Sequence, residues 1–529
     1  MPVAQPGVVS ALARLFRHAV WIGWLMISIV AAFYYVKKAE DGQSAFIRWR
    51  PQVLQLISGV NIYDTKMFPN PPIMPLTLYP LMSLPPVAGA LCWFVVKAAL
   101  TGISVWLCFE IIRPPACPLA SWIQVAILIC SLRPILSDLH HGNNNLVILF
   151  LIVATLQAWR KGYDVLAGLI LALAICYKVT PLLFVPYLAY KRSWRAVGAT
   201  VLGMGVFLLI VPSLVLGPQF NGECLGMWWH RMLSPYLTKG LVGDQEMNQS
   251  MVGVLTRLST APRGMEGPYA RKLMGLNLVD WSPQVVSGLV KTLSLVLVGL
   301  LAVFSRTKTD RRTDPRLLGE FSLVVLTMLF VSERSWKHHY VTLLLPYTYL
   351  MYEFGIAREV TRRARLAISV AISTSVLLMA TTSNVLGGLF VQHEGHKVAQ
   401  GYGMFLWAGV VLYLATAWRV WRESGRVGGD GAWIYGVWRR DTERGNSKPG
   451  IEEDAAGSSQ AVLRIRKVFD TSPNRSPVEP SSRTSTSSQP SSRAVWKMTR
   501  WGWACISIIT CFLASFSKYS PGENRYPPR

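Results

Sequence analysis

Long apolar stretches recur along this chain from about residue 20 to about residue 420, with only short polar breaks between them. Many of them approach the roughly 20 residues that a helix needs to cross the hydrocarbon core of a bilayer. They are continuously apolar, which excludes the alternating strands of a membrane barrel. The pattern therefore predicts an all-α fold, a polytopic membrane bundle of about 12 transmembrane helices, with about 10–13 as the range. The predicted spans are 20–36, 86–111, 118–133, 145–158, 164–178, 180–190, 196–216, 284–304, 317–332, 339–353, 366–389 and 403–420.

Basic residues gather in alternate breaks between these spans. If the N-terminus lies inside, every second break is basic, as the positive-inside rule requires. The residues on this cytoplasmic side are Arg160, Lys161, Lys191, Arg192, Arg195, Arg306, Lys308, Arg311, Arg312, Arg316, Arg358, Arg362, Arg363 and Arg365. The breaks at 37–85 and 217–283 then face outward. The net charge of +25 is thus a topology signal, and no nucleic acid partner is expected.

The chain divides by composition near residue 421. Residues 1–421 carry the predicted spans, and the first helix has no small-residue cleavage site, which predicts that it is retained. Residues 422–529 turn rich in Ser, Pro, Gly and Arg and are predicted to form a mostly disordered, basic cytoplasmic tail. Its apolar segment 501–516 is either a membrane-surface segment or a thirteenth helix. The eight cysteines show neither a disulfide framework nor zinc spacing.

Unusual polar clusters occupy the outward breaks. The first break is rich in proline, which removes amide donors and predicts a segment kept out of regular helix. A second cluster, Arg133–Asn145, places Asp138 beside two histidines at an expected helix-to-helix turn. Two histidines alone do not predict a metal site. An acidic group, two imidazoles and three amides at one turn still mark chemistry at the membrane edge.

A lysine interrupts the apolar stretch between Val165 and Tyr187. An unpaired ammonium in hydrocarbon is costly, so Lys178 indicates function, and lysine binds phosphate as a point charge. A snorkelling lysine at a helix end is the alternative. The break at Ser332–Tyr340 mixes acid, base, imidazole and tryptophan, which suits sugar stacking, phosphate binding and proton transfer.

In their order along the chain, these clusters resemble glycosyltransferase family 87, the mannosyltransferase-like branch of the GT-C membrane glycosyltransferases. The matching elements are G-x-x-x-Y at Gly59–Tyr63, P-P at Pro71–Pro72, Y-P-L at Tyr79–Leu81, H-G-N at His141–Asn143, K-x-T-P at Lys178–Pro181, Asn248–Ser250 followed by Arg257, and S-W-x-H-H-Y at Ser335–Tyr340.

The resemblance implies a GT-C type bundle in the cell membrane that transfers a hexose, often mannose, on the extracytoplasmic face. The implied donor is a polyprenyl-phosphate-linked sugar, and the acceptor is a lipid or a glycan. The implied reaction inverts the anomeric centre and needs no nucleotide-sugar site, cofactor or metal. Membrane lipids are the remaining expected partners.

The resemblance also implies site residues. The family places an acidic base before the glycine of its first motif, but that position is Ala45 here. The candidate bases on the outward face are Asp41, Asp64, Asp138 and Glu246. We expect the base to be Asp64, which follows the motif tyrosine, or Asp138, which adjoins the histidines. The other roles that we predict are catalysis by His339, and substrate binding by Lys178, Arg133, His338, Asn248 and Arg257.

Two other function classes fit a bundle of this kind: a membrane transporter, and a lipid-linked glycan ligase or flippase. Carriers usually carry internal repeats and helices broken at the bilayer midplane. This chain shows no clear repeat, and its polar clusters gather toward one face. The sequence therefore favours a transferase over these alternatives.

Overall fold

The computed structural model describes residues 6–65, 68–114, 118–235, 247–260, 277–310, 312–383 and 395–424. Every regular element within these ranges is a helix, which confirms the all-α prediction. Seven of the described helices are long and apolar enough to cross a membrane, and four shorter apolar helices accompany them. This confirms a polytopic membrane protein, whereas the count of about 12 spans stays a prediction.

The helices fall where the apolar stretches predicted them. They are α1 (Pro6–Glu40), α5 (Pro86–Ile112), α6 (Ser121–His141), α7 (Asn145–Arg160), α8 (Asp164–Tyr177), η1 (Thr180–Leu183), α9 (Phe184–Tyr190), α10 (Trp194–Gly205), η2 (Val206–Ile210), α11 (Val211–Leu216), α16 (Pro283–Phe304), α17 (Arg316–Val331), η4 (Lys337–Leu343), α18 (Leu344–Gly355), α19 (Arg362–Ala380) and α22 (Met404–Ser424). Each predicted span thus corresponds to a helix or to a run of adjoining helices.

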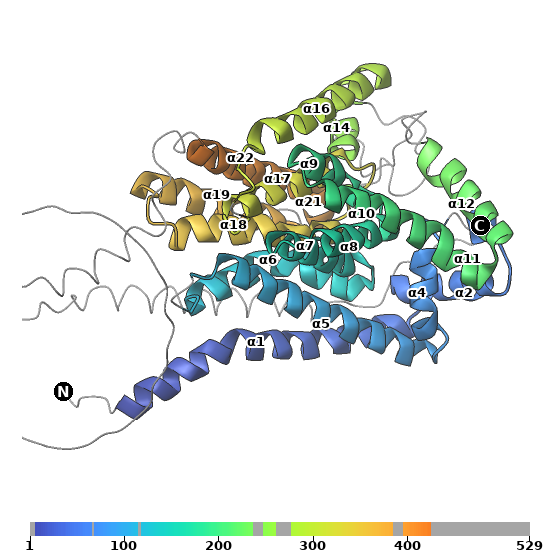
Figure 1. Ribbon diagram of the computed structural model, residues 1–529, viewed down its shortest axis with the longest axis horizontal. Coiled ribbons are helices and arrows are strands. Elements are labelled where there is room, and N and C mark those ends of the chain that lie inside the picture. The colour runs from blue at the N-terminus through green and yellow to red at the C-terminus, as the bar shows by residue number, and fades with distance from the viewer. Residues whose placement is uncertain are drawn as a thin grey trace, which may run out of the picture. The chain divides into compact units, whose positions relative to one another are not determined.

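Small residues bring the central helices together. α8 packs between α7 and α10, and α6 packs against α1, α18 and η4 (Figure 1). A methyl group added at Gly168 of α8 would lie 2.3 Å from the carbonyl oxygen of Ala196, and one at Gly203 of α10 would lie 2.7 Å from Cβ of Ala172. Such small residues let helix backbones approach closely inside a membrane, where no hydrophobic effect drives helices together.

The first outward break is largely helical, so the prediction that its prolines exclude regular helix is wrong. It forms α2 (Ala45–Ile57), α3 (Ile62–Thr65) and α4 (Ile73–Met82). Ser44 caps α2, accepting a hydrogen bond from the amide of Ile47 at 3.2 Å. Pro75 lies in the first turn of α4, where a missing amide breaks no helical hydrogen bond. α2 and α4 lie at one end of the bundle, beside α11 and α12 (Pro218–Trp228) (Figure 1).

The helix before the histidine cluster is longer than the sequence predicted. The expected span ends at residue 133, but α6 continues through Pro134 to His141 and ends at Gly142, which has a left-handed φ of 78°. The Gly142 amide donates to the carbonyl of Asp138 at 2.9 Å. Asp138 therefore lies on the last turn of a helix, and only residues 142–144 connect α6 to α7.

The second outward break contains several helices in its described parts. Besides α12 it contains η3 (Trp229–Leu233) and α14 (Met251–Ser259), and α21 (Gly395–Gly401) follows later in the chain. Glu246 and the apolar segment 501–516 lie outside the described residues. The tail predicted from residue 422 does so as well, apart from its first three residues, which end α22. The predictions made for these parts stay predictions.

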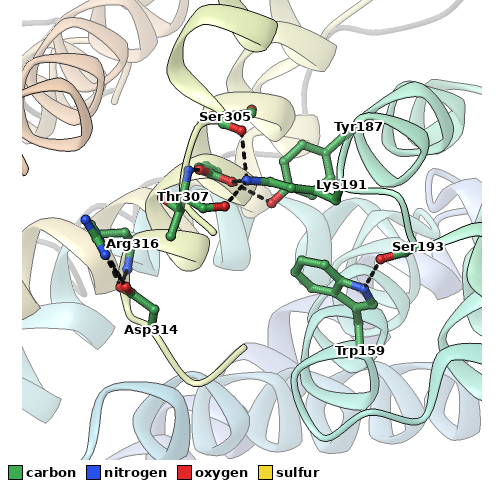
Figure 2. Close-up of polar contacts among 9 residues, drawn as sticks. Trp159, Tyr187, Lys191, Ser193, Ser305, Thr307, Asp314 and Arg316 are labelled. Atoms are coloured by element: carbon green, nitrogen blue, oxygen red, sulfur yellow. Dashed lines mark hydrogen bonds and ion pairs between the residues drawn. The ribbon is translucent and has the colours of Figure 1, made fainter. Parts of the chain in front are cut away.

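A buried lysine at the predicted cytoplasmic end of the bundle is fully paired with groups of the chain. Lys191, after α9, forms a buried ion pair of 2.6 Å with Glu320 of α17. The same ammonium donates to the carbonyls of Ser305 and Thr307 at 2.8 Å each, and the hydroxyl of Tyr187 donates to Glu320 (Figure 2). One of the breaks predicted to face the cytoplasm is thereby tied to the bundle, and its buried cation is satisfied by the chain itself.

Candidate active site

The predicted break at Lys178 is present in the structure. α8 ends at Tyr177, Lys178 is extended with φ −160° and ψ 127°, and η1 begins at Thr180 with Pro181 in its first turn. Proline removes an amide donor from the helical hydrogen-bond pattern, which favours a break in the helix at this point. The side chain of Lys178 is half-buried, and its ammonium donates to Oδ1 of Asn145 at 2.8 Å.

A row of four polar side chains, of which three are buried and Lys178 is half-buried, begins at that contact. Asn145 donates through Nδ2 to Oδ2 of Asp138 at 2.9 Å, and Oδ1 of Asp138 pairs with the ammonium of Lys97 at 3.3 Å. Lys97 also donates to the main-chain carbonyl of Asp138 at 2.9 Å. Lys97 and Asp138 are both fully buried. We call Lys97, Asp138, Asn145 and Lys178 the buried row; it carries one carboxylate between two ammonium groups.

The contacts of Asp138 within the buried row are those of a residue that orients its neighbours. Both carboxylate oxygens have partners within the chain, and the side chain has no exposed surface. A base must reach the proton that it removes. The geometry therefore favours Asp138 as the residue that orients Asn145, and through it Lys178.

Aromatic side chains enclose the Lys97 end of the row. The ammonium of Lys97 lies 5.8 Å from the ring centroid of Tyr35 and 5.9 Å from that of Trp93, within reach of a cation–π interaction. The indole of Trp93 donates to the carbonyl of Gly142 at 3.0 Å. Gly142 packs so closely against Tyr35 that an added methyl would lie 2.9 Å from the phenol oxygen. Trp93 and Tyr35 thus hold the end of α6 in place.

A pocket opens at the Lys178 end of the row. Its polar lining residues are Asn145, Lys178, Thr180, Ser332, Ser335, His339 and Thr342. Nδ1 of His339 lies 3.1 Å from the carbonyl oxygen of Arg334, and the amide of Trp336 lies farther from the same atom, at 3.3 Å. The shorter contact is to an oxygen that can only accept, which favours the tautomer protonated at Nδ1. Nε2 is then an acceptor.

A second imidazole pair adjoins this pocket. His338 is buried and stacks on His141, with ring centroids 4.6 Å apart. Its Nε2 lies 3.1 Å from the amide nitrogen of Asn143. Burial lowers the pKa of His338 well below its usual range, and the neighbouring imidazoles and lysines add to this, so the ring is neutral. Across the part of the chain that the structure describes, no group of three His, Cys, Asp or Glu could hold a metal ion.

The first outward segment attaches directly beside Lys178. The hydroxyl of Tyr63 donates to the carbonyl of Asn70 at 2.8 Å, and the amide of Asn70 donates to the carbonyl of Tyr177 at 2.5 Å. The hydroxyl groups of Thr77 and Tyr177 also share a hydrogen bond. Through these contacts, Tyr63 and the F-P-N-P-P stretch at Phe68–Pro72 hold the first outward segment against the end of α8.

The other predicted residues lie around this centre. Asp64 is exposed on α3 and pairs with Arg231 at 2.6 Å. Asp41 is exposed just after α1. Arg133 donates to the carbonyl of Thr382 at 2.9 Å. The structure thus brings together Lys178, His338, His339 and Asp138, whereas neither Asp64 nor Arg133 is among the described residues that line the pocket.

Asn248 and Arg257 form a brace for the histidine segment. The side chain of Asn248 is buried, accepts from the amide of Ser335 at 3.1 Å and donates to the carbonyl of Glu333 at 3.0 Å. Arg257 donates to the carbonyls of Gly401 and Asn248 at 3.1 and 2.9 Å. In this geometry the two residues predicted to bind substrate contact main-chain atoms that hold the pocket wall.

Sequence reasoning did not select Lys97, Asn145 or Thr180 as site residues. Lys97 carried a usable signal, because it is a lone lysine inside the apolar span 86–111. The criterion that selected Lys178 would have predicted a buried acidic partner for it. Asn145 carried no such signal, since an asparagine at a helix start is ordinarily explained by the turn alone.

Comparison with known proteins adds independent findings. The profile of Glycosyltransferase family 87 matches residues 68–332, just over half of the chain. The match contains the whole buried row, whereas Asp64 and His339 lie outside it. No solved structure matches the chain.

Three curated relatives are distant in sequence, and each match covers more than half of this chain. The polyprenol-phosphate-mannose-dependent alpha-(1-2)-phosphatidylinositol mannoside mannosyltransferase of Mycolicibacterium smegmatis is 24% identical over 61% of this chain and 71% of its own. The protein of the same name from Mycobacterium tuberculosis is 23% identical over 70% of this chain and 84% of its own. The polyprenol-phosphate-mannose-dependent alpha-(1-2)-phosphatidylinositol pentamannoside mannosyltransferase of M. smegmatis is 27% identical over 64% and 77%.

The glycine that ends α6 allows a test of the packing around the row. Gly142 and Gly162 both have positive φ, but only an added methyl at Gly142 would meet another group, Tyr35. Each change to alanine should cost about 1–2 kcal/mol of backbone strain. Gly142→Ala should cost about 1–3 kcal/mol more through overpacking. Thermal unfolding of the purified variants measures the difference; equal shifts would show that Tyr35 does not fix this turn.

Proposed function

Because this chain belongs to glycosyltransferase family 87, and is therefore a membrane glycosyltransferase, we propose that it transfers mannose from a polyprenyl-phosphate-linked donor to a lipid acceptor. The printed names of the relatives state a polyprenol-phosphate-mannose donor and phosphatidylinositol mannoside acceptors. The same hexose and the same two lipid classes are the simplest assignment for this chain.

The geometry of Lys178 is the observation that carries the proposal. An ammonium group has three N–H donors, and the contact with Asn145 satisfies one. Among the described residues no side chain forms an ion pair with Lys178, although it lines the pocket. A donor phosphate would supply the missing anion through a charge-assisted hydrogen bond worth about 1.5–3 kcal/mol.

The proposed reaction increases the negative charge beside that lysine. The acceptor hydroxyl oxygen forms a bond to C1 of the mannose, and the bond from C1 to the phosphate oxygen breaks with its electron pair. The donor is a phosphodiester with one negative charge, whereas the departing polyprenyl phosphate is a monoester with two. A fixed ammonium stabilises the developing charge more than the ground state, which is how such a group accelerates a reaction. Asp138 and Asn145 keep the ammonium fixed.

The acceptor proton requires a base, for which we propose Asp64, with His339 as a partner. Asp64 is exposed and belongs to the segment that docks beside Lys178, whereas Asp138 is buried and paired. Asp64 is separated by a few residues from Asn70, which bonds the end of α8. Nε2 of His339, as an acceptor, could take or pass on the proton. The proposed base thus belongs to the first outward segment, although Ala45 occupies the position at which the family carries its acidic base.

The charge pattern supports our proposal that this chemistry takes place on the extracytoplasmic side of a cell membrane. Lys161 and Lys178 flank α8 at its two ends, and the 14 residues of that helix span roughly 21 Å at about 1.5 Å per residue. The positive-inside rule assigns the Lys161 end to the cytoplasm. The pocket then opens toward the opposite leaflet, where a polyprenyl chain can present its sugar.

Removal of the Lys178 ammonium should impair donor use. We expect Lys178→Met to raise the donor KM at least tenfold, because one charge-assisted bond corresponds to about that factor or more. Lys161→Met, an exposed lysine at the other end of α8, should leave KM unchanged. The assay combines purified protein, labelled polyprenyl-phosphate-mannose and a membrane lipid extract, with product analysis. An unchanged KM and kcat in Lys178→Met would reduce the residue to a snorkelling lysine.

The two aspartates should affect different kinetic constants. Asp64→Asn should lower kcat by about 10² with little change in donor KM, as loss of a general base does. Asp138→Asn should lower the unfolding temperature, because it leaves the Lys97 ammonium buried without a carboxylate, and in the folded protein it should act mainly on donor KM, because it loosens Lys178. Arg231→Gln removes the same ion pair as Asp64→Asn but keeps the carboxylate, so it should retain most activity. Equal losses in Asp64→Asn and Arg231→Gln would make Asp64 a loop anchor rather than a base.

A further inference from the structure

The chain pairs several of its buried or half-buried cations with carboxylates. In the described residues five such pairs have a buried or half-buried cation. They are Lys97 with Asp138, Lys191 with Glu320, Arg312 with Asp164, Arg316 with Asp314, and Arg419 with Glu353. Figure 2 shows the Lys191 cluster, in which the ammonium is surrounded by its acceptors. A buried charge without such partners carries a large desolvation penalty, which explains the pattern.

Three cations beside the stacked pair of His141 and His338 have no such carboxylate partner among the described residues. Lys38 at the end of α1 and Lys337 at the start of η4 are half-buried, and Arg48 of α2 is exposed. None forms an ion pair with a described carboxylate, although Glu40 and Asp41 follow Lys38 in the chain. Arg48 Nη2 instead lies 3.5 Å from Nε2 of His141. We call Lys38, Arg48 and Lys337 the unpaired cations.

These cations converge on one place. Burial lowers the pKa of Lys337 to about 7, and the charges of Arg133 and Lys38 contribute to that shift. α1, α2 and η4 all reach the end of α6: α1 and η4 pack against that helix, and Arg48 of α2 contacts His141. Mutual repulsion of positive charges at one site is unfavourable unless an anion offsets it. The arrangement therefore calls for a negatively charged ligand.

This place is separate from the pocket at Lys178. The pocket is lined by Lys178 and His339 but by none of the unpaired cations. His338 lies between the two places, since it stacks on His141 and its ring centroid is 4.9 Å from that of His339, which lines the pocket. Trp336 lies there as well, half-buried, with its ring centroid 5.4 Å from that of His338. An aromatic ring beside an anion site is suited to stack on a sugar.

We propose that the unpaired cations bind the phosphodiester of the acceptor lipid, with Trp336 beside the sugar that the lipid carries. This inference rests on the proposed function, because it presumes that the donor phosphate is bound at Lys178. A transfer between two lipids brings two anions to one site, and like charges in a low dielectric require separate counter-charges. A phosphodiester is ionised at every physiological pH, and a lipid headgroup reaches the membrane edge where these helices end.

The test measures two ligands on the full chain in detergent micelles by isothermal titration calorimetry. Dihexanoyl phosphatidylinositol represents the acceptor, farnesyl phosphate represents the donor anion, and dihexanoylglycerol is the phosphate-free control. The double variant Lys38→Gln/Lys337→Gln should raise the Kd for phosphatidylinositol at least about tenfold, a loss of about 1.4 kcal/mol, and leave that for farnesyl phosphate within about twofold. Lys178→Gln should do the reverse. Lys37→Gln, an exposed lysine next to Lys38, should change neither.

Several outcomes would overturn the inference. They are an unchanged Kd for phosphatidylinositol in the double variant, loss of farnesyl phosphate binding instead, or equally tight binding of dihexanoylglycerol. If the double variant unfolds at a lower temperature than the wild-type chain, Arg48→Gln decides, because Arg48 is exposed and its loss should still weaken phosphatidylinositol binding. A wild-type chain that binds phosphatidylinositol through these cations but does not bind farnesyl phosphate would overturn the donor site alone.

Discussion

One buried carboxylate organises this site. Asp138 lies at the end of α6 with no exposed surface, between the ammonium of Lys97 and the amide of Asn145. A charge in that position is tolerated only with well-placed partners, and removal of one partner is strongly destabilising. The carboxylate therefore requires Lys97 on one side and a donor on the other. Because Asn145 turns its nitrogen to Asp138, its oxygen faces Lys178, and the second lysine is oriented toward the pocket as a consequence.

The surrounding structure supports that row from three directions. Trp93 and Tyr35 enclose the end of α6. Asn70 fastens the first outward segment to the last residue of α8, directly before Lys178. Asn248 holds the segment that carries the histidines. Residues that look like substrate ligands in the sequence can thus act by fixing the pocket wall, which a transferase needs because a small displacement of a catalytic group is costly.

Much of this could be predicted from the sequence. The spans, the break at Lys178 and the family follow from hydrophobic periodicity, proline chemistry and motif order, which are local signals. The helices of the first outward segment and the extension of α6 past Pro134 were missed, because proline removes one hydrogen bond and tertiary packing can compensate for it. Lys97 and Asp138 are 41 residues apart, and no local pattern shows that they meet. The sequence does not choose between Asp138 and Asp64 as the base for the same reason. The two aspartates differ in burial, which no local pattern shows.

The central claim is that Lys178, held by Asn145 and Asp138, receives the donor phosphate. The most direct measurement is an experimental structure of the full chain in a lipid nanodisc with a polyprenyl phosphate bound. Our account predicts a phosphate oxygen within about 3 Å of the Lys178 ammonium, with the contacts among Lys97, Asp138 and Asn145 retained. A phosphate bound between Lys38 and Lys337, with Lys178 still directed only at Asn145, would contradict it.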